Sequence, residues 1–395
     1  MADRGHVVKG RGKPGWLNLI GPKLLACSTV LHSDSREQRT MRELTALVDD
    51  KDLLIKIAVK EGVACVLYKN LLKSGALTTL SPPQREELHS LYHRTVHHNL
   101  KLIRDLKEIL QRLNQEKIHV VLIQGIALLP TVYDDIGLRP LTDIDLWVLQ
   151  ENYSGLISIL SSVGYSRDPI YPNTFRRGST TLDLHTHILW ADRIKAHRML
   201  IRKGQEDIYH NTKIIDFEGQ EARCLGQYDQ VVYLCLHALK HHVGSLIWLV
   251  DIKNLIADWK RSDWETFMNR ARELGQEKTI SYVFYLLLHL FGFQPPVAID
   301  QLLETKGPCF LEKRVLRQRI EGDSLPIWAP VLLFSAGKGL QRRLPLIFET
   351  LFPRPEILRQ IFVASPDRTV WQLYFMRVLQ LFGMVRMSLK GKAGA

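Results

Sequence analysis

The sequence has few cysteines and no long apolar run, and these two absences exclude several classes of protein. Only five cysteines occur among 395 residues, and none forms a C-x-x-C pair. Such an odd, scattered set is typical of a reducing compartment rather than a disulfide scaffold, so we expect a cytoplasmic protein. The apolar runs Tyr282–Phe293 and Val370–Val385 do not predict a membrane span of roughly 20 residues, because the first is too short and Arg377 interrupts the second.

Glycine-rich nucleotide loops are missing as well. No Walker A sequence occurs. The single G-x-G-x-x-G, at Gly10–Gly15, follows no predicted strand and contains Pro14 where a helix should begin. The sequence therefore predicts neither a P-loop NTPase nor a dinucleotide-binding Rossmann domain.

Acidic residues are outnumbered, 41 against 53 Lys and Arg, so the formal net charge is +12. The excess is concentrated in residues 331–395, which contain ten basic and three acidic residues. This composition favours an anionic partner, either RNA or a membrane surface, although a solvated basic face has the same composition. Residues 1–25 are also basic and rich in glycine, and we expect a flexible arm there.

The spacing of apolar residues changes along the chain and indicates an α+β fold. Residues 26–116 repeat apolar side chains at intervals of three and four, which is typical of helices. Three strands are then predicted at residues 118–124, 141–149 and 180–189, followed by a hairpin that turns at Glu218-Gly219. We therefore expect a small mixed sheet within residues 117–226, flanked by helical segments at 26–116, 227–330 and 331–395.

Two carboxylates stand close together on the second expected strand. Residues two apart on a strand share a face, so Asp143 and Asp145 should project together, roughly 7 Å apart at Cα. Carboxylates this close repel each other unless a cation lies between them. Magnesium, or manganese in its place, fits the pair because it prefers oxygen ligands and also binds substrate phosphates.

The third expected strand adds a further carboxylate. In the sequence LDLHTHI, Asp183, His185 and His187 share one face. If this strand lies beside the second, Asp183 joins the pair, and three carboxylates can hold two metal ions about 4 Å apart. Asp183 is then the expected general base. The H-x-H pattern leaves an alternative open, a zinc-dependent hydrolase built on His185 and His187.

Phosphate-binding residues are expected just before the metal site. Gly125 lies at a predicted strand-to-helix turn, where glycine lets a phosphate approach the free N–H groups of the helix. Gln124 belongs to the same turn. Arg139 precedes Asp143 by four residues, and its fork of donors suits phosphate oxygens. Lys240, on a later predicted helix, is expected to be solvated.

The order of these motifs resembles the uncharacterised nucleotidyltransferase family of the polymerase-beta-like superfamily. The resemblance covers roughly residues 40–300 and rests on Gly125, Ala127, Tyr133, Arg139, Asp143, Asp145, Gly164, Tyr165, Asp183 and His185. Two positions depart from it, because Gln124 stands where the family often has Lys, and Ile126 where the superfamily usually has Gly or Ser. The resemblance implies that Asp143, Asp145 and Asp183 bind metal and that the Gly125 turn holds the phosphates of an NTP. It also implies transfer of a nucleoside monophosphate to an acceptor, with release of pyrophosphate.

The acceptor and the base of the NTP stay open. A small molecule, a natural-product precursor, a protein side chain and an RNA end all fit the sequence. Two further interpretations also stand beside the enzyme. One is a catalytically degenerate nucleotide-binding or scaffold module, which Gln124 and Ile126 support. The other is a basic RNA-binding protein.

Overall fold

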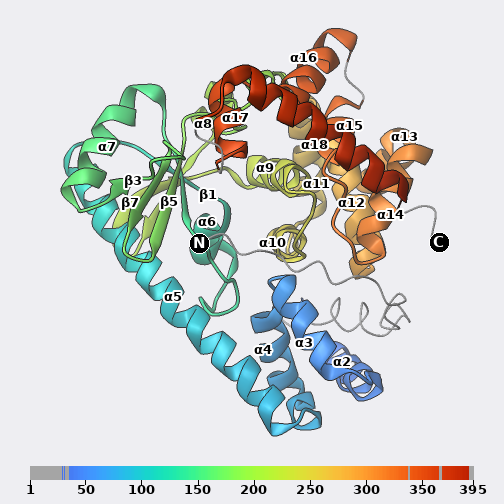
Figure 1. Ribbon diagram of the computed structural model, residues 1–395. Coiled ribbons are helices and arrows are strands. Elements are labelled where there is room, and N and C mark those ends of the chain that lie inside the picture. The colour runs from blue at the N-terminus through green and yellow to red at the C-terminus, as the bar shows by residue number, and fades with distance from the viewer. Residues whose placement is uncertain (1–28, 30, 32–34, 337–338, 364–366, 391–395) are drawn as a thin grey trace.

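The computed structural model describes residues 29, 31, 35–336, 339–363 and 367–390. A seven-stranded mixed sheet lies on one side and a body of helices on the other (Figure 1). The α+β fold that the sequence predicts is confirmed. The flexible arm expected at residues 1–25 lies outside the described residues.

The first helices lead into one long helix that crosses the sheet. They are α2 (Ser35–Leu47), α3 (Lys51–Lys60), α4 (Ala64–Ser74), the short 3₁₀ helix η2 (Ala76–Thr79) and α5 (Pro82–Gln115). Helix α5 begins with Pro82 in its first turn, where a missing N–H breaks no helical bond. The side chain of Gln84 accepts a hydrogen bond of 2.9 Å from the N–H of Ser81. From there α5 runs along β5 and β7.

The strands follow the order β3-β4-β5-β2-β1-β7-β6 across the sheet. β2 pairs in parallel with β5, and β1 in parallel with β7, whereas the other neighbours are antiparallel. The strands are β1 (Val121–Ile123), β2 (Ile144–Trp147), β3 (Ser166–Arg167), β4 (Thr174–Arg177), β5 (Thr180–His185), β6 (Lys213–Phe217) and β7 (Gln220–Cys224). All residues of β1 and β2 are buried, including Asp145 of β2, whose neighbours in the strand are apolar.

The three predicted strands are present with narrower bounds, and the predicted hairpin is β6–β7. Its turn residues Glu218 and Gly219 have φ values of 52° and 80°, the left-handed conformations that a tight hairpin requires. Strands β3 and β4 were not predicted. They are only 2 and 4 residues long and carry three arginines, so no run of alternating apolar residues marks them.

Further helices lie among the strands and after them. Those among the strands are α6 (Gln124–Val132), η3 (Gln150–Asn152), α7 (Tyr153–Ser162), η4 (Lys195–Met199) and α8 (Gln205–His210). Those after the sheet are α9 (Gln227–Lys240), α10 (Ile247–Leu255), α11 (Arg261–Leu274), α12 (Glu277–Phe291), α13 (Val297–Lys306), α14 (Phe310–Ile320), α15 (Ala329–Ser335), α16 (Leu340–Leu351), α17 (Pro355–Ile361) and α18 (Val370–Lys390). Within the described ranges, no helix is both long enough and apolar enough to cross a membrane.

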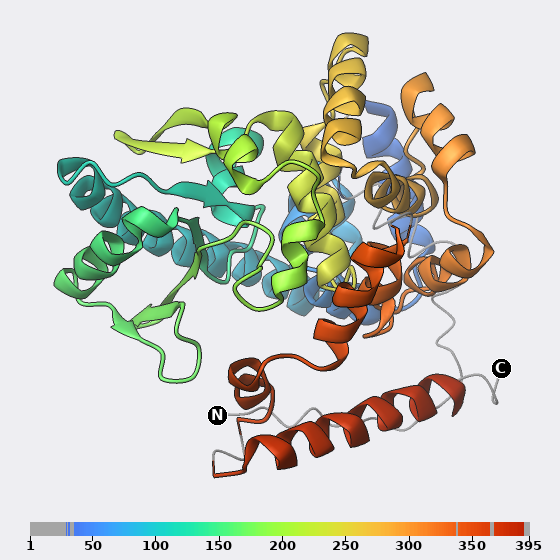
Figure 2. The ribbon, with the colours of Figure 1, turned by 90° about the horizontal axis from the view of Figure 1, so that it is seen from above.

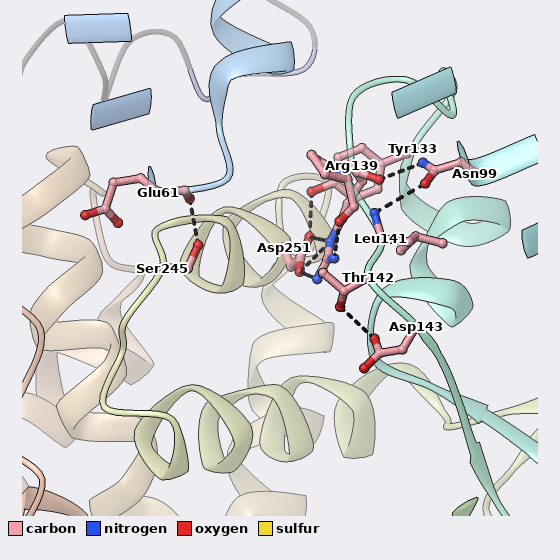
Figure 3. Close-up of polar contacts among 10 residues, drawn as sticks. Glu61, Asn99, Tyr133, Arg139, Leu141, Thr142, Asp143, Ser245 and Asp251 are labelled. Atoms are coloured by element: carbon pink, nitrogen blue, oxygen red, sulfur yellow. Dashed lines mark hydrogen bonds and ion pairs between the residues drawn. The ribbon is translucent and has the colours of Figure 1, made fainter. Parts of the chain in front are cut away.

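A buried ion pair joins the first helices to those that follow the sheet. Glu61, just after α3, forms a bond of 2.5 Å with Arg319 of α14, and both side chains are buried. The Glu61 carboxylate also accepts a hydrogen bond from the N–H of Leu246, and its carbonyl accepts one from the Ser245 hydroxyl at 2.7 Å (Figure 3). These contacts hold the N-terminal end of α10, the helix that faces the candidate site.

Candidate active site

The three predicted carboxylates converge from two neighbouring parallel strands. The register of β2 and β5 places Asp145 directly beside Asp183. Asp143 precedes Asp145 by two residues and therefore projects to the same side of the sheet. One carboxylate oxygen from each of the three side chains lies within 4.8 Å of the others. Three oxygen ligands this close together can share a divalent cation.

Hydrogen bonds orient each carboxylate before any ligand arrives. The Thr142 hydroxyl donates to Asp143 at 2.8 Å. On the neighbouring strand β4, the Thr174 hydroxyl donates to Asp183 at 2.5 Å. These contacts fix the orientation of two of the three carboxylates.

Two side chains contact the same carboxylate oxygen of Asp145. The amide of Gln124 donates to its Oδ1 at 2.8 Å, and Nε2 of His185 lies 2.8 Å from the same atom. Burial, reinforced by the charge of Asp145, raises the pKa of Asp143 to about 6. A bound cation would relieve this repulsion, so the electrostatics of the cluster favour a positive ligand.

Gln124 and Gly125 form the expected strand-to-helix turn. Gln124 has a φ of 59°, an uncommon left-handed conformation for a residue with a side chain. A Cβ atom on Gly125 would lie 2.6 Å from the Leu141 side chain and 2.8 Å from a guanidinium nitrogen of Arg139. Packing therefore favours glycine at residue 125, whether or not a phosphate binds there.

Arg139 lies in a buried network rather than free in solvent. Its guanidinium forms an ion pair of 2.9 Å with Asp251 of α10 and donates to the carbonyl of Pro140 at 2.8 Å (Figure 3). The hydroxyl of Tyr133 donates to the other oxygen of Asp251 at 2.6 Å. Most donors of Arg139 are thus occupied, and a direct phosphate contact stays a prediction. The network itself joins the loop before Asp143 to α10.

Asn99 of α5 holds the same loop and was missed in the sequence. Its amide donates to the carbonyl of Ile136 at 2.6 Å. The amide also donates to the carbonyl of Arg139 at 2.8 Å, and the amide oxygen accepts from the N–H of Leu141 at 3.3 Å (Figure 3). Asn99 is completely buried. A polar residue on the apolar face of an amphipathic helix is the only sign of this role in the sequence.

A cavity of about 540 Å³ opens over the carboxylates, within the size range of ligand pockets. Its far walls come from α9, α10, α17 and the segment after β5. The residues on these walls include Trp190, Asp192, Arg193, His237, Lys240, His241, Trp248, Arg354, Glu356, Ile357 and Gln360. The predicted residues Gln124, Gly125, Arg139 and His185 also line it.

Lys240 lies in this cavity, contrary to the expectation that it is solvated. Its ammonium lies 3.8 Å from the centre of the Trp190 ring. Burial and the charge of Arg193 lower the pKa of Lys240 to about 7. Burial also lowers the pKa of the adjacent His241 to about 3, so that imidazole is neutral. Arg193 and Lys240, which is only partly protonated near pH 7, thus line the same cavity as the three acids.

The two histidines of the H-x-H pattern have different environments. His185 contacts Asp145 and lines the cavity. His187 is buried, and its Nδ1 accepts a hydrogen bond of 3.1 Å from the N–H of Leu189. Among the described residues, the candidate metal ligands that converge are the three aspartates, without either histidine.

Comparison with known proteins identifies the family. Residues 48–292 match a family described as Uncharacterised nucleotidyltransferase. The matched segment contains the three aspartates, Gln124, Gly125 and Lys240, whereas α17 lies beyond it. No curated protein and no solved structure matches the chain. Because residues 48–292 make up more than half of the 395 residues, the chain belongs to this uncharacterised nucleotidyltransferase family.

Proposed function

We propose that the protein is a magnesium-dependent nucleotidyltransferase that moves a nucleoside monophosphate from an NTP to an acceptor. The observation that carries the proposal is the convergence of Asp143, Asp145 and Asp183, with ligand oxygens within 4.8 Å of one another. Family membership supplies the general reaction class. The acceptor attacks the α-phosphorus, the bond between the α- and β-phosphates breaks, and pyrophosphate leaves with the bonding electrons.

The donor set fits magnesium, or manganese in its place. All three ligands are carboxylates, and hard oxygen donors with room for phosphates are what these ions prefer. When bound, the ion neutralises phosphate charge and makes an acceptor hydroxyl more acidic. Asp183 is the proposed base that takes the acceptor's proton, and the Thr174 hydroxyl fixes its orientation.

Cations on the opposite wall are proposed to hold the pyrophosphate portion of the NTP. Lys240 is held against Trp190 and, among the described residues, has no ion-pair partner. Arg193 lines the same wall. Two positive groups facing a metal-binding cluster complement a triphosphate, whose charge is shared between metal and protein in phosphoryl transfer.

The acceptor is proposed to bind against α17. Glu356, Ile357 and Gln360 of that helix line the cavity, and they lie outside the segment that matches the family. Residues within the family segment would thus bind the metal and the NTP. The wall formed by α17 would select the acceptor. The proposal covers a small molecule, a natural-product precursor, a protein side chain and an RNA end as acceptors. The cytoplasm stays the predicted compartment.

Release of pyrophosphate tests the proposal. Each of the four NTPs is incubated with magnesium and a cell extract that supplies acceptors, and pyrophosphate is measured with wild type and with an Asp143→Asn, Asp145→Asn double variant. We expect release with wild type and loss of at least about two orders of magnitude in the variant, because both groups hold the metal.

A matched charge variant controls for the loss of two negative charges. Asp300→Asn, Glu304→Gln removes the same charge from α13, which contributes no residue to the cavity. Equal release from the aspartate variant and wild type would exclude the proposed chemistry. NTP binding without release from wild type would instead favour the degenerate binding module.

A further inference from the structure

The last described helix, α18, presents an unpartnered apolar stripe. Its members are Trp371, Phe375, Leu379 and Phe382, with exposed fractions of 83, 65, 54 and 69%. They recur at intervals of four, four and three, so they share one face of the helix. Figure 2 shows α18 at the edge of the molecule, on the outside of α17. Four large apolar side chains on one exposed face indicate an interaction surface.

The opposite face of α18 is anchored, so the stripe is held outward. Leu373 is completely buried. The Tyr374 hydroxyl donates to the carbonyl of Pro353 at 3.0 Å. Arg377 donates to the carbonyls of Thr350 and Leu351 at 2.9 and 3.1 Å. The helix therefore packs on the end of α16 and on α17, and the stripe faces away from both.

Charge around the stripe identifies its partner. Between residues 371 and 383 the only charged residue is Arg377, and its guanidinium is engaged by carbonyls on the anchored side. Basic residues follow the stripe in the sequence, at Arg386, Lys390 and Lys392, whereas Arg368 before it stands next to Asp367. α18 contains no acidic residue. An uncharged apolar stripe with aromatic members, followed in the sequence by a basic stretch without acids, complements the surface of an anionic bilayer.

We propose that α18 docks the protein on an anionic lipid surface, with the stripe inserted at the level of the headgroups. RNA fits less well, because a nucleic-acid groove needs cations interleaved with the aromatic rings to meet successive phosphates. The docked helix packs against α17, which lines the catalytic cavity. Docking therefore places the proposed acceptor wall next to the membrane.

Sedimentation with vesicles tests this docking. The full chain is mixed with phosphatidylcholine vesicles, with or without about one third phosphatidylglycerol. We expect binding to the anionic vesicles that weakens as salt is raised. A Phe375→Ser, Phe382→Ser variant should bind roughly tenfold or more weakly, because two inserted rings are lost. The control is Val297→Ser, Phe310→Ser, which removes two exposed apolar side chains from α13 and α14.

Fluorescence supplies a second readout that does not depend on folding of the serine variant. Trp371 should enter the apolar part of the interface, so wild type should show a blue shift with anionic vesicles. Trp371→Phe should still bind but lose most of that shift. Three results overturn the proposal: vesicle binding unchanged in the serine variant, a stripe-dependent dimer with no vesicle binding, or stripe-dependent binding of an RNA oligonucleotide in place of vesicles.

Discussion

The guanidinium of Arg139 lies 2.9 Å from the carboxylate of Asp251, and both side chains are buried. The two residues come from distant parts of the chain, the loop before β2 and helix α10. Through this pair β2, which contains Asp145 and begins directly after Asp143, is tied to the helices that form the opposite side of the cavity. The stability of the protein should therefore depend strongly on it.

Asp251→Asn should lower the free energy of unfolding by about 3–5 kcal/mol, because it leaves the Arg139 charge buried without a counter-ion. Urea denaturation measures the change. The double variant Arg139→Met, Asp251→Leu should recover much of the loss, since it removes both charges together. As a reference, Glu265→Gln breaks the exposed pair with Arg261 and should change stability by less than about 1 kcal/mol. Equal effects of the buried and exposed substitutions would contradict this account.

Gly125→Ala should reduce stability by about 1–3 kcal/mol, because its Cβ would overlap Leu141 and the fixed guanidinium of Arg139. Thermal unfolding in the absence of metal compares the stability of the variant with that of wild type. Leu141→Ala removes the nearest obstacle, at 2.6 Å, so its effect and that of Gly125→Ala should not add. Gly383→Ala is the matched control: no atom lies within 4 Å of its Cβ, and an alanine in α18 should be neutral or stabilising. Additive losses at residues 125 and 141 would show that the close contact is not responsible.

Lys240→Met should weaken binding of magnesium pyrophosphate by about tenfold or more, whereas Lys240→Arg should retain most of it. Isothermal titration gives both affinities. Because the pKa of Lys240 is lowered to about 7, wild-type affinity should fall as pH rises above that value and the ammonium loses its proton. Lys240→Arg stays charged, so any remaining pH dependence in that variant belongs to the ligand or to other groups. If Lys240→Met binds magnesium pyrophosphate as tightly as wild type, Lys240 does not contribute to phosphate binding.

This titration also separates the Lys240 prediction from the catalytic proposal. If wild type releases pyrophosphate from an NTP but Lys240→Met has normal affinity, only the role of Lys240 is lost. If Lys240→Met fails to bind pyrophosphate while no NTP is turned over by wild type, the anion site stands and the chemistry does not.

Acid should destabilise the protein through His197. Burial lowers the pKa of His197 from 6.5 to about 4 in the folded protein. The unfolded chain therefore binds the proton first, so this contribution is present above pH 6.5 and is lost as pH falls toward 4. The full effect amounts to about 3 kcal/mol. Urea unfolding between those pH values should show a shallower pH dependence for His197→Gln than for wild type. Identical slopes would rule out His197 as a source of acid sensitivity.

The core of the candidate site was accessible from local sequence patterns. Asp143 and Asp145 are two residues apart on a strand, and alternation placed Asp183 on one face of the next predicted strand. The parallel register that pairs Asp145 with Asp183 then brings the three together. The placement of the three side chains agrees with the sequence pattern because strand periodicity fixes which side a residue faces, and their metal-binding role stays a prediction.

Other parts of the site depend on contacts that no local pattern contains. Asp251 reaches Arg139 across 112 residues, and Asn99 reaches Arg139 across 40. Lys240 looked like an ordinary surface lysine at the end of a helix until the fold placed it against Trp190. The contribution of α17 was also missed, because a seven-residue helix far downstream of the strands carries no mark of the cavity that it closes.

The position of α17 has a consequence for synthesis on the ribosome. Both strands that hold the aspartates are translated long before residues 354–360, which form one cavity wall. Domains fold from the N-terminus as they emerge, so a nascent chain can assemble the aspartate cluster while the chamber above it is still open. Premature termination shortly before codon 354 would consequently yield a polypeptide with its acidic cluster in place but without the wall that α17 supplies.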